Sequence, residues 1–229
     1  MGTLRSPATR RAARLRLAAA VLAAGVLAAV LASGCRLFQP AMPELPSAGV
    51  YVPRYNDPDT VLASMAAGIA LKAQGFAAYS GALADTQDTE GERRAFRAFF
   101  DPAVLAVMPT TPPPIGGWQL AHEQQFYSYF VRVFNDPYVM QWTPDVQHPD
   151  VTVDESHKIL YRHYQVQVQA ASDTFTIAIG YADLYFVKKS PNKWAITRWD
   201  DRVDPAVGAQ PADPNQQTFG ARRLNSQGG

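Results

Sequence analysis

After Pro137 the chain contains four successive runs of residues that favour β-strands, and no other feature limits the fold as strongly. Each run is rich in β-branched and aromatic side chains, which is typical of strands; the runs span residues 138–146, 158–170, 175–189 and 193–203. The polar segments ASDT (171–174) and SPNK (190–193) separate the last three runs and predict hairpin turns. We therefore expect an antiparallel meander of about four strands in the second half of the chain.

The residues before this meander show the signals of helices. The stretch DPD (57–59) offers a capping side chain and a proline for a first helical turn. An apolar stripe at helical spacing follows and ends at Gly75; it consists of Leu62, Met65, Ala66, Ile69 and Ala73. Further helices are predicted over 76–85, over 91–108 with a break at Asp101, and over 118–136. The loop PTTPPPIGG (109–117) separates the last two, because consecutive prolines cannot continue a helix.

Helices that precede an antiparallel meander are the pattern of an α+β fold. The segment 57–85, a helix after GGW (116–118), and the closing segment GYADLYFVKKSPNKWAITRWDD (180–201) resemble the nuclear-transport-factor-2-like superfamily, which includes SnoaL-like and ketosteroid-isomerase-like proteins. The resemblance covers roughly residues 58–204. It implies a cystatin-like cone in which a curved sheet wraps around N-terminal helices and encloses a pocket. Isomerases, dehydratases, hydrolases and non-catalytic binding domains share this fold, so the fold alone assigns no function.

The N-terminal region has the features of a secretory signal peptide. The first 34 residues contain five arginines and no acidic residue, and the uncharged stretch 17–31 is rich in small apolar side chains. This pattern predicts a signal peptide over residues 1–34, and the stretch is too short and too rich in alanine for a membrane span. Cys35, the only cysteine of the chain, follows directly.

The segment LASGC (31–35) resembles the lipobox of bacterial lipoproteins, with Ala32 where leucine is usual. The resemblance implies that the chain is cut before Cys35 and that Cys35 is acylated, which would anchor the protein in the membrane. A chance cysteine beside an ordinary cleavage site is the alternative, and a disulfide would need a second chain. Arg36 rather than aspartate follows the cysteine, which by the same resemblance favours the outer membrane of a Gram-negative cell envelope.

The mature chain would consist of a tether, one domain and a tail. Residues 35–57 carry four prolines and are expected to form an extended tether. Residues 58–204 would form the domain, and the polar residues 205–229 are expected to be disordered. The whole chain has 21 basic and 20 acidic residues, so loss of the five N-terminal arginines would leave about four more negative than positive charges. No basic block is then left, and no nucleic-acid partner is expected.

Alternation along the strands indicates which side chains share a face. One apolar face would contain Leu160, Arg162, Tyr164, Val166 and Val168, and another Ile177, Ile179, Tyr181, Asp183 and Tyr185. If the apolar faces of these strands all point toward the helices, the side chains of Arg162, Tyr181, Asp183 and Arg198 lie together inside the domain. Such a group would suit acid–base chemistry by Asp183, with Tyr181 as hydrogen-bond donor. We favour the interpretation that Arg162 and Asp183 neutralise each other at the rim of a partly apolar cleft, which would lower the pKa of Asp183 and make it a poor base.

Aromatic residues crowd the predicted helix over 118–136. Their number suggests that one side of the helix is buried and the other forms a contact surface, but we favour the alternative, a core with scattered surface aromatics. The residues concerned are Trp118, Phe126, Tyr127, Tyr129, Phe130 and Phe134. Recognition of a partner would use either an aromatic surface on this helix or the outer face of the sheet. We take Trp118 and Tyr127, together with Arg162 and Asp183, as candidate binding residues. Trp194 and Ile196 are predicted to face the helices.

The four histidines indicate no metal site. His122 and Glu123 begin a fragment of the HExxH motif, but Phe126 stands where the second histidine belongs. A cluster of Asp154, Glu155 and His157 could meet a metal ion, although a polar turn explains these residues equally well. We therefore expect neither a metal nor a cofactor.

These features favour a lipid-anchored envelope protein whose domain binds a small ligand or a protein without catalysis, and a second copy of the chain is one partner to consider. The alternative is an envelope enzyme of isomerase or dehydratase type that uses Asp183 and Tyr181.

Overall fold

The structure of the chain is a computed structural model. It describes residues 51–85, 95–108, 110–171, 173–190, 192–211, 213 and 216–228. The predicted signal peptide, Cys35 and most of the predicted tether lie outside the described residues.

The first helical segment begins where the sequence predicts it. Helix α2 spans Pro58–Ala70; Asp57 caps it by accepting a 2.9 Å hydrogen bond from the Thr60 amide, and the Thr60 hydroxyl accepts one from the Asp57 amide. The 3-10 turn η1 (Lys72–Gly75) and helix α3 (Phe76–Ser80) follow. A Cβ atom on Gly75 would lie 2.0 Å from the Gly68 carbonyl oxygen, so this contact between α2 and the end of η1 requires a glycine.

All described strands belong to one sheet. Its members are β1 (Arg97–Phe99), β2 (Trp118–Gln119), β3 (Tyr138–Pro144), β4 (Val151–Thr152), β5 (His157–Gln169), β6 (Thr174–Ser190) and β7 (Lys193–Arg202). The order is β2-β1-β7-β6-β5-β3, with β4 also paired to β5. Strands β1 and β7 run parallel, and the other pairs are antiparallel. The four long strands and the α+β class are confirmed, whereas the three short strands were not predicted.

Three predicted helices differ in the structure. The helix expected over 76–85 is shorter, since α3 ends at Ser80. The helix expected over 91–108 is confirmed only after its predicted break at Asp101, where Pro102–Val107 form helix α4. The part before the break is wrong in its described residues, because Arg97–Phe99 form strand β1. The Asp101 side chain caps α4 by accepting a hydrogen bond from the Ala103 amide. The helix expected over 118–136 is shorter: α5 spans Leu120–Phe130, because Trp118 pairs with Ala98 in the sheet.

The segment 205–229, expected to be disordered, contains helix α6 (Phe219–Asn225). Thr218 caps it, and Phe219 and Leu224 are completely buried. The prediction of disorder is therefore wrong for this helix: the polar composition of the whole segment concealed a short apolar face that packs on the domain.

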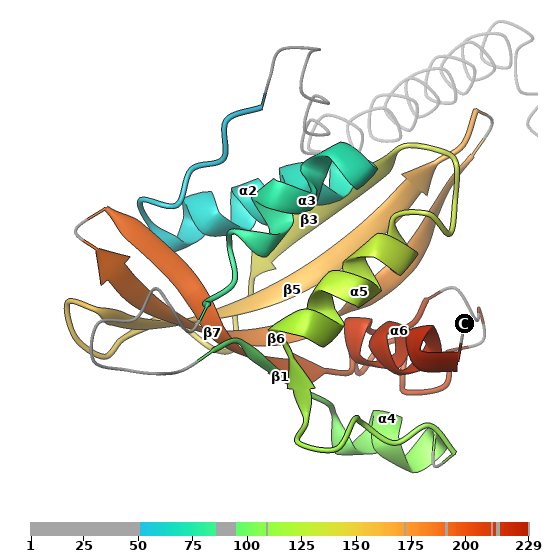
Figure 1. The fold of residues 1–229 in the computed structure, drawn as a ribbon. Coiled ribbons are helices and arrows are strands. Elements are labelled where there is room, and N and C mark those ends of the chain that lie inside the picture. Colours follow the sequence, from blue (N-terminus) through green and yellow to red (C-terminus); the bar gives the residue numbers. More distant parts are fainter. Residues whose placement is uncertain are drawn as a thin grey trace, which may run out of the picture. The chain divides into compact units, whose positions relative to one another are not determined.

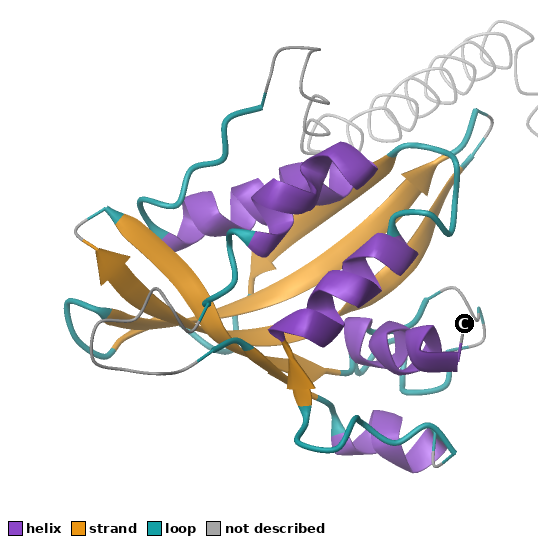
Figure 2. Cartoon of the chain, in the orientation of Figure 1, coloured by secondary structure: helices purple, strands orange, loops and turns teal. Residues whose placement is uncertain are grey.

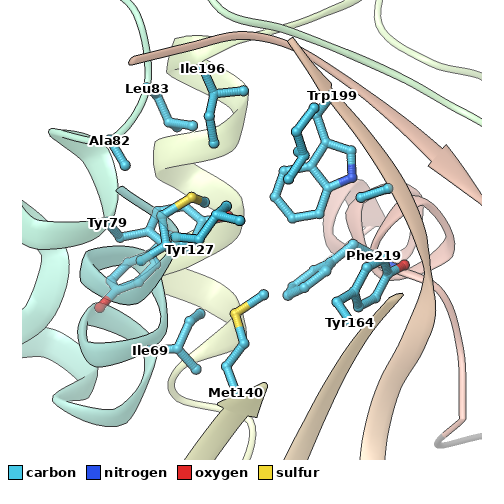
Figure 3. Packing of buried hydrophobic residues seen from close by; sticks show 14 of the residues in the cluster. Ile69, Tyr79, Ala82, Leu83, Tyr127, Met140, Tyr164, Ile196, Trp199 and Phe219 are labelled. Carbon is cyan, nitrogen blue, oxygen red and sulfur yellow. The ribbon is translucent and has the colours of Figure 1, made fainter. Parts of the chain in front are cut away.

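Helices α2, α3, α5 and α6 lie over the same side of the curved sheet (Figure 1; Figure 2). The core fills the space between them and the sheet, where Ile69, Tyr79 and Tyr127 from the helices approach Ile196 and Trp199 from β7 (Figure 3). Trp194 and Ile196 are both buried in this core, which confirms their predicted inward position.

Candidate functional site

The predicted meeting of Arg162 and Asp183 does not occur. Arg162 pairs with Ala182 across the β5–β6 ladder, whereas Asp183 pairs with Tyr161. Because neighbouring residues point to opposite faces, Arg162 points to the helix-covered face and Asp183 to the other. The face assignment failed at a β-bulge: Val166 pairs with Ala178 and Gln167 with Thr176, which leaves Ile177 as an extra residue. One extra residue moves every later side chain to the opposite face.

Arg162 has different partners from the one expected. Its buried guanidinium group donates to Asp150 at 2.6 and 2.9 Å and to Asp59 at 3.1 Å. These bonds connect strand β5 with the start of α2 and with the loop before β4. The contacts identify Arg162 as a structural residue, so its assignment to a binding site is not supported.

Asp183 lies on the face of the sheet opposite the helices. Arg202 approaches Asp183 Oδ1 with both Nε (2.8 Å) and Nη2 (2.7 Å). Burial raises the pKa of Asp183 above its ordinary value, although Arg202 acts in the opposite direction. The expected lowering of this pKa is therefore wrong. Tyr181 lies nearby, with its ring 4.8 Å from that of His163 and 5.5 Å from the Arg202 guanidinium carbon.

Further charged and aromatic side chains continue this surface. Arg198 lies 4.6 Å from the centre of the Phe99 ring and 4.8 Å from that of Tyr185, and it forms two 2.6 Å bonds with Asp200. His163 Nε2 lies 3.0 Å from Asp204. We define the outer sheet face as Tyr161, His163, Tyr181, Asp183, Tyr185, Arg198, Asp200 and Arg202, all partly or largely exposed. The four helices lie over the opposite side of the sheet (Figure 1). Loop residues contact part of the outer sheet face, since the His148 ring lies 5.7 Å from that of Tyr161 and Asp145 lies 3.4 Å from Arg202.

A second polar cluster lies inside the core. Glu123 of α5 accepts 2.8 Å bonds from Nε and Nη2 of Arg223 of α6, and 2.6 Å bonds from the Tyr79 hydroxyl and the Trp118 indole. Glu123 and Arg223 have no exposed surface. Burial alone would lower the pKa of Arg223. The nearby Glu123 carboxylate has the opposite effect through its charge and its hydrogen bonds, and the pKa of Arg223 lies above its ordinary value. The Arg223 Nη1 group has no described hydrogen-bond acceptor, and the guanidinium lies 4.4 Å from the centre of the Trp199 ring.

Asp201 forms a second buried contact with the C-terminal helix. Its carboxylate accepts bonds from the Tyr164 hydroxyl (2.7 Å) and the Gly220 amide (2.8 Å), and the Phe219 amide donates to the Tyr164 oxygen at 2.8 Å. Burial raises the pKa of Asp201 above its ordinary value, against the lowering effects of Arg223 and Tyr164. These bonds fix the start of α6 against the sheet, where the rings of Tyr164 and Phe219 lie side by side (Figure 3).

The sequence reasoning missed Glu123, Arg223 and Asp201. Glu123 was considered only as part of a failed metal motif, and Arg223 lay in a segment expected to be disordered. A local signal for α6 exists, because Thr218 is a good N-cap residue and Phe219 and Leu224 stand on either side of Arg223 in an apolar pattern. The pairing of Glu123 with Arg223 spans 100 positions and has no local signal.

Trp118 and Tyr127 belong to the core rather than to a contact surface. Their exposed fractions are 2% and 1%, and the Tyr127 hydroxyl donates to the Gly68 carbonyl at 2.7 Å. Tyr129 is the aromatic residue of α5 with substantial exposure, 41%. The aromatic contact surface considered for this helix is therefore wrong, and the favoured interpretation, a core with a scattered surface aromatic, is confirmed.

Among the described residues, no group of three or more His, Cys, Asp or Glu side chains is arranged to hold a metal ion. Asp154 and His157, considered above, form an ion pair at 2.9 Å. No helix in the described segments has the length and apolar character needed to cross a membrane.

No protein-family model and no curated protein matches the chain. Solved structures with a similar fold include a protein of unknown function from Mycobacterium tuberculosis, with 12% identity over 74% of this chain and 82% of that chain and a TM-score of 0.45. A protein of unknown function with a cystatin-like fold from Nostoc punctiforme has 9% identity, coverages of 64% and 87%, and a TM-score of 0.42. A nuclear-transport-factor-2-like protein with a cystatin-like fold from Novosphingobium aromaticivorans has 10% identity, coverages of 63% and 78%, and a TM-score of 0.40. The last description names the family that the sequence resembles.

Proposed function

We propose that this chain is a lipid-anchored protein of the bacterial cell envelope whose domain binds a protein partner without catalysis. The observation that carries the proposal is the outer sheet face, where tyrosine and arginine side chains contact one another and remain partly exposed.

The composition of the outer sheet face suits protein recognition. Tyrosine and arginine are enriched among the residues that dominate binding energy at protein interfaces. Arg198 is already held by Phe99, Tyr185 and Asp200, and Arg202 by Tyr181 and Asp183. Side chains ordered in this way lose less conformational entropy when a partner binds, which favours affinity.

The buried carboxylates support binding rather than chemistry. A general base must be able to accept a proton from a substrate within hydrogen-bond reach. Both oxygens of Glu123 accept bonds from Arg223, Tyr79 and Trp118, and both oxygens of Asp201 accept bonds from Tyr164 and Gly220. These groups are engaged in holding the helices together.

The anchoring part of the proposal rests on the LASGC segment and on the basic and apolar residues before it. Acylation of Cys35 would keep the domain at the membrane, and the prolines of residues 36–57 would hold it away from the lipid surface. The residue after the cysteine, Arg36, favours the outer membrane.

Site-specific photo-cross-linking in cells tests the binding surface. A Tyr185→p-benzoylphenylalanine variant of the full-length chain places the probe on the outer sheet face, and the matched Tyr129→p-benzoylphenylalanine variant places it on exposed α5. We expect a discrete cross-linked protein, or a cross-linked second copy, from residue 185 alone. Arg198→Ala should reduce that product. Equal products from both positions, or none from residue 185, would refute the proposal.

The second candidate is an acid–base enzyme that uses Asp183 and Tyr181. It is favoured by the raised pKa of Asp183, which increases the basicity of its carboxylate. The test compares the native chain with Asp183→Asn on a panel of small carbonyl and hydroxyl compounds. Turnover by the native chain alone would support the enzyme, whereas equal inactivity with unchanged cross-linking supports the binding function.

A further inference from the structure

An apolar groove lies at one edge of the sheet and shares Trp118 with the buried Glu123 cluster. It has a volume of about 320 Å³ and lies among β1, β2, α4 and the loop before β2. Its walls include Phe99, Phe100, Leu105, Pro113 and Trp118. Phe99 is 46% exposed, while the Trp118 indole nitrogen is bonded to Glu123, so one wall is accessible and another is fixed to the core.

One cation stands on the rim of this groove. Arg97 is exposed and its Nη1 group donates a 2.7 Å bond to the Gly116 carbonyl oxygen. Among the described residues, no carboxylate forms an ion pair with Arg97. Its neighbour across the β1–β7 ladder is Arg198, whose charge is matched by Asp200. Among the described residues, the rim therefore carries a positive charge without a carboxylate partner beside an apolar surface.

The loop leaves the guanidinium group of Arg97 open to a ligand. Gly116 and Gly117 have φ angles of 84° and 80°, a conformation that strongly favours glycine. A Cβ atom on Gly117 would lie 3.8 Å from Arg97 Nη1, within van der Waals contact. The two glycines thus orient the carbonyl that holds Arg97 and add no side chain over the cation.

We propose that this groove binds a small amphipathic anion, a monocarboxylate with an apolar body, whose carboxylate pairs with Arg97. The planar guanidinium group matches a carboxylate with two parallel hydrogen bonds. The apolar walls favour a hydrocarbon or aromatic body at about 25 cal/mol per Å² of area removed from water. A volume of about 320 Å³ lies at the lower end of ligand sites, which limits the ligand to a small acid. This proposal does not rest on the protein-binding function proposed above, although Phe99 borders both surfaces.

The test uses the full-length chain in lipid nanodiscs and the water-soluble probe 3-phenylpropanoate, with 3-phenylpropanamide as its neutral counterpart and empty nanodiscs as background. Binding is followed by saturation-transfer NMR. We expect saturable binding of the acid, weakened by added salt, and weaker binding of the amide. Arg97→Gln should weaken the acid about tenfold and leave the amide unchanged, since the variant loses charge-assisted hydrogen bonds that only the carboxylate forms.

Two variants keep the test specific. Arg132→Gln removes another exposed arginine, one bonded to the Ser128 carbonyl oxygen, and should change neither affinity. Phe99→Ala, at a half-exposed position, should weaken acid and amide alike because it removes an apolar wall. Absence of saturation, or acid binding that Arg97→Gln leaves intact, would overturn the proposal. Either result would leave the cross-linking test of the outer sheet face unaffected.

Discussion

Replacement of Arg223 by methionine should destabilise the fold strongly, because it leaves the Glu123 carboxylate buried without its counter-charge. Arg223 supplies two 2.8 Å bonds to Glu123, and neither side chain has exposed surface. Removing one partner of a buried ion pair costs about 3–5 kcal/mol. Tyr79 and Trp118 still donate to Glu123 in the variant, so we expect a loss near the lower end, about 3 kcal/mol.

Urea unfolding followed by tryptophan fluorescence measures this loss. With a slope of about 2 kcal/mol per molar urea, the midpoint of Arg223→Met should fall by about 1.5 M. The matched control Arg132→Met changes an exposed arginine and should alter stability by less than about 0.5 kcal/mol. Both chains should be compared in the same detergent.

A double variant separates loss of the pair from loss of packing. Glu123→Gln combined with Arg223→Met removes both charges, while the glutamine oxygen still accepts a bond from Tyr79 or Trp118. The double variant should therefore be more stable than Arg223→Met alone. A loss below about 1 kcal/mol for Arg223→Met, or a double variant no better than the single one, would refute the reasoning.

Three further outcomes are expected. Cys35→Ser should abolish acylation and move the protein from the membrane to the soluble fraction on cell fractionation; a variant that stays membrane-bound and is processed normally contradicts the anchor. Trp194→Ala should cost about 3–5 kcal/mol in urea unfolding, because Trp194 is 95% buried, and a loss under about 1 kcal/mol would contradict its core position. Burial raises the pKa of Asp201, so its stabilising contribution is complete below the ordinary carboxyl pKa of about 4 and decreases as pH rises through the folded-state pKa. The stability of the native chain relative to Asp201→Asn should accordingly fall from pH 4 upward, and parallel stability–pH curves would contradict this assignment.

The long strands and the first helix could be predicted because their signals are local. Strand β5 alternates apolar and polar residues along most of its length, and α2 has its capping aspartate and proline directly before the apolar stripe. The faces of β6 and β7 could not be predicted in the same way. Ile177 and Thr197 are extra residues at bulges, and neither is a glycine or proline that would mark an interruption. Each bulge reverses the alternation, which is why Asp183 and Arg198 lie on the outer sheet face.

The buried cluster depends on information that no local pattern contains. Glu123 and Arg223 are ordinary surface residue types, and only the fold brings them together inside an apolar core. A charge is buried at tolerable cost when a partner and further hydrogen bonds compensate it, and here the partner comes from the far end of the chain. The residues before α6 are rich in proline and polar side chains, which is why the sequence predicted disorder for the whole segment 205–229. Phe219 and Leu224 are nevertheless completely buried in the folded domain.

The side chain of Phe99 connects the two proposed binding surfaces. Its ring lines the apolar groove and also lies 4.6 Å from the guanidinium carbon of Arg198 on the outer sheet face. Phe99→Ala should therefore weaken both 3-phenylpropanoate binding and the cross-link from residue 185, because it removes a groove wall and releases Arg198 from one of its two aromatic contacts. Arg97→Gln should weaken the acid alone, since Arg97 contributes to the groove and not to that stack. If Phe99→Ala reduces ligand binding and leaves the cross-link at its native yield, the Phe99–Arg198 contact is not part of the recognition surface, and the two sites are independent.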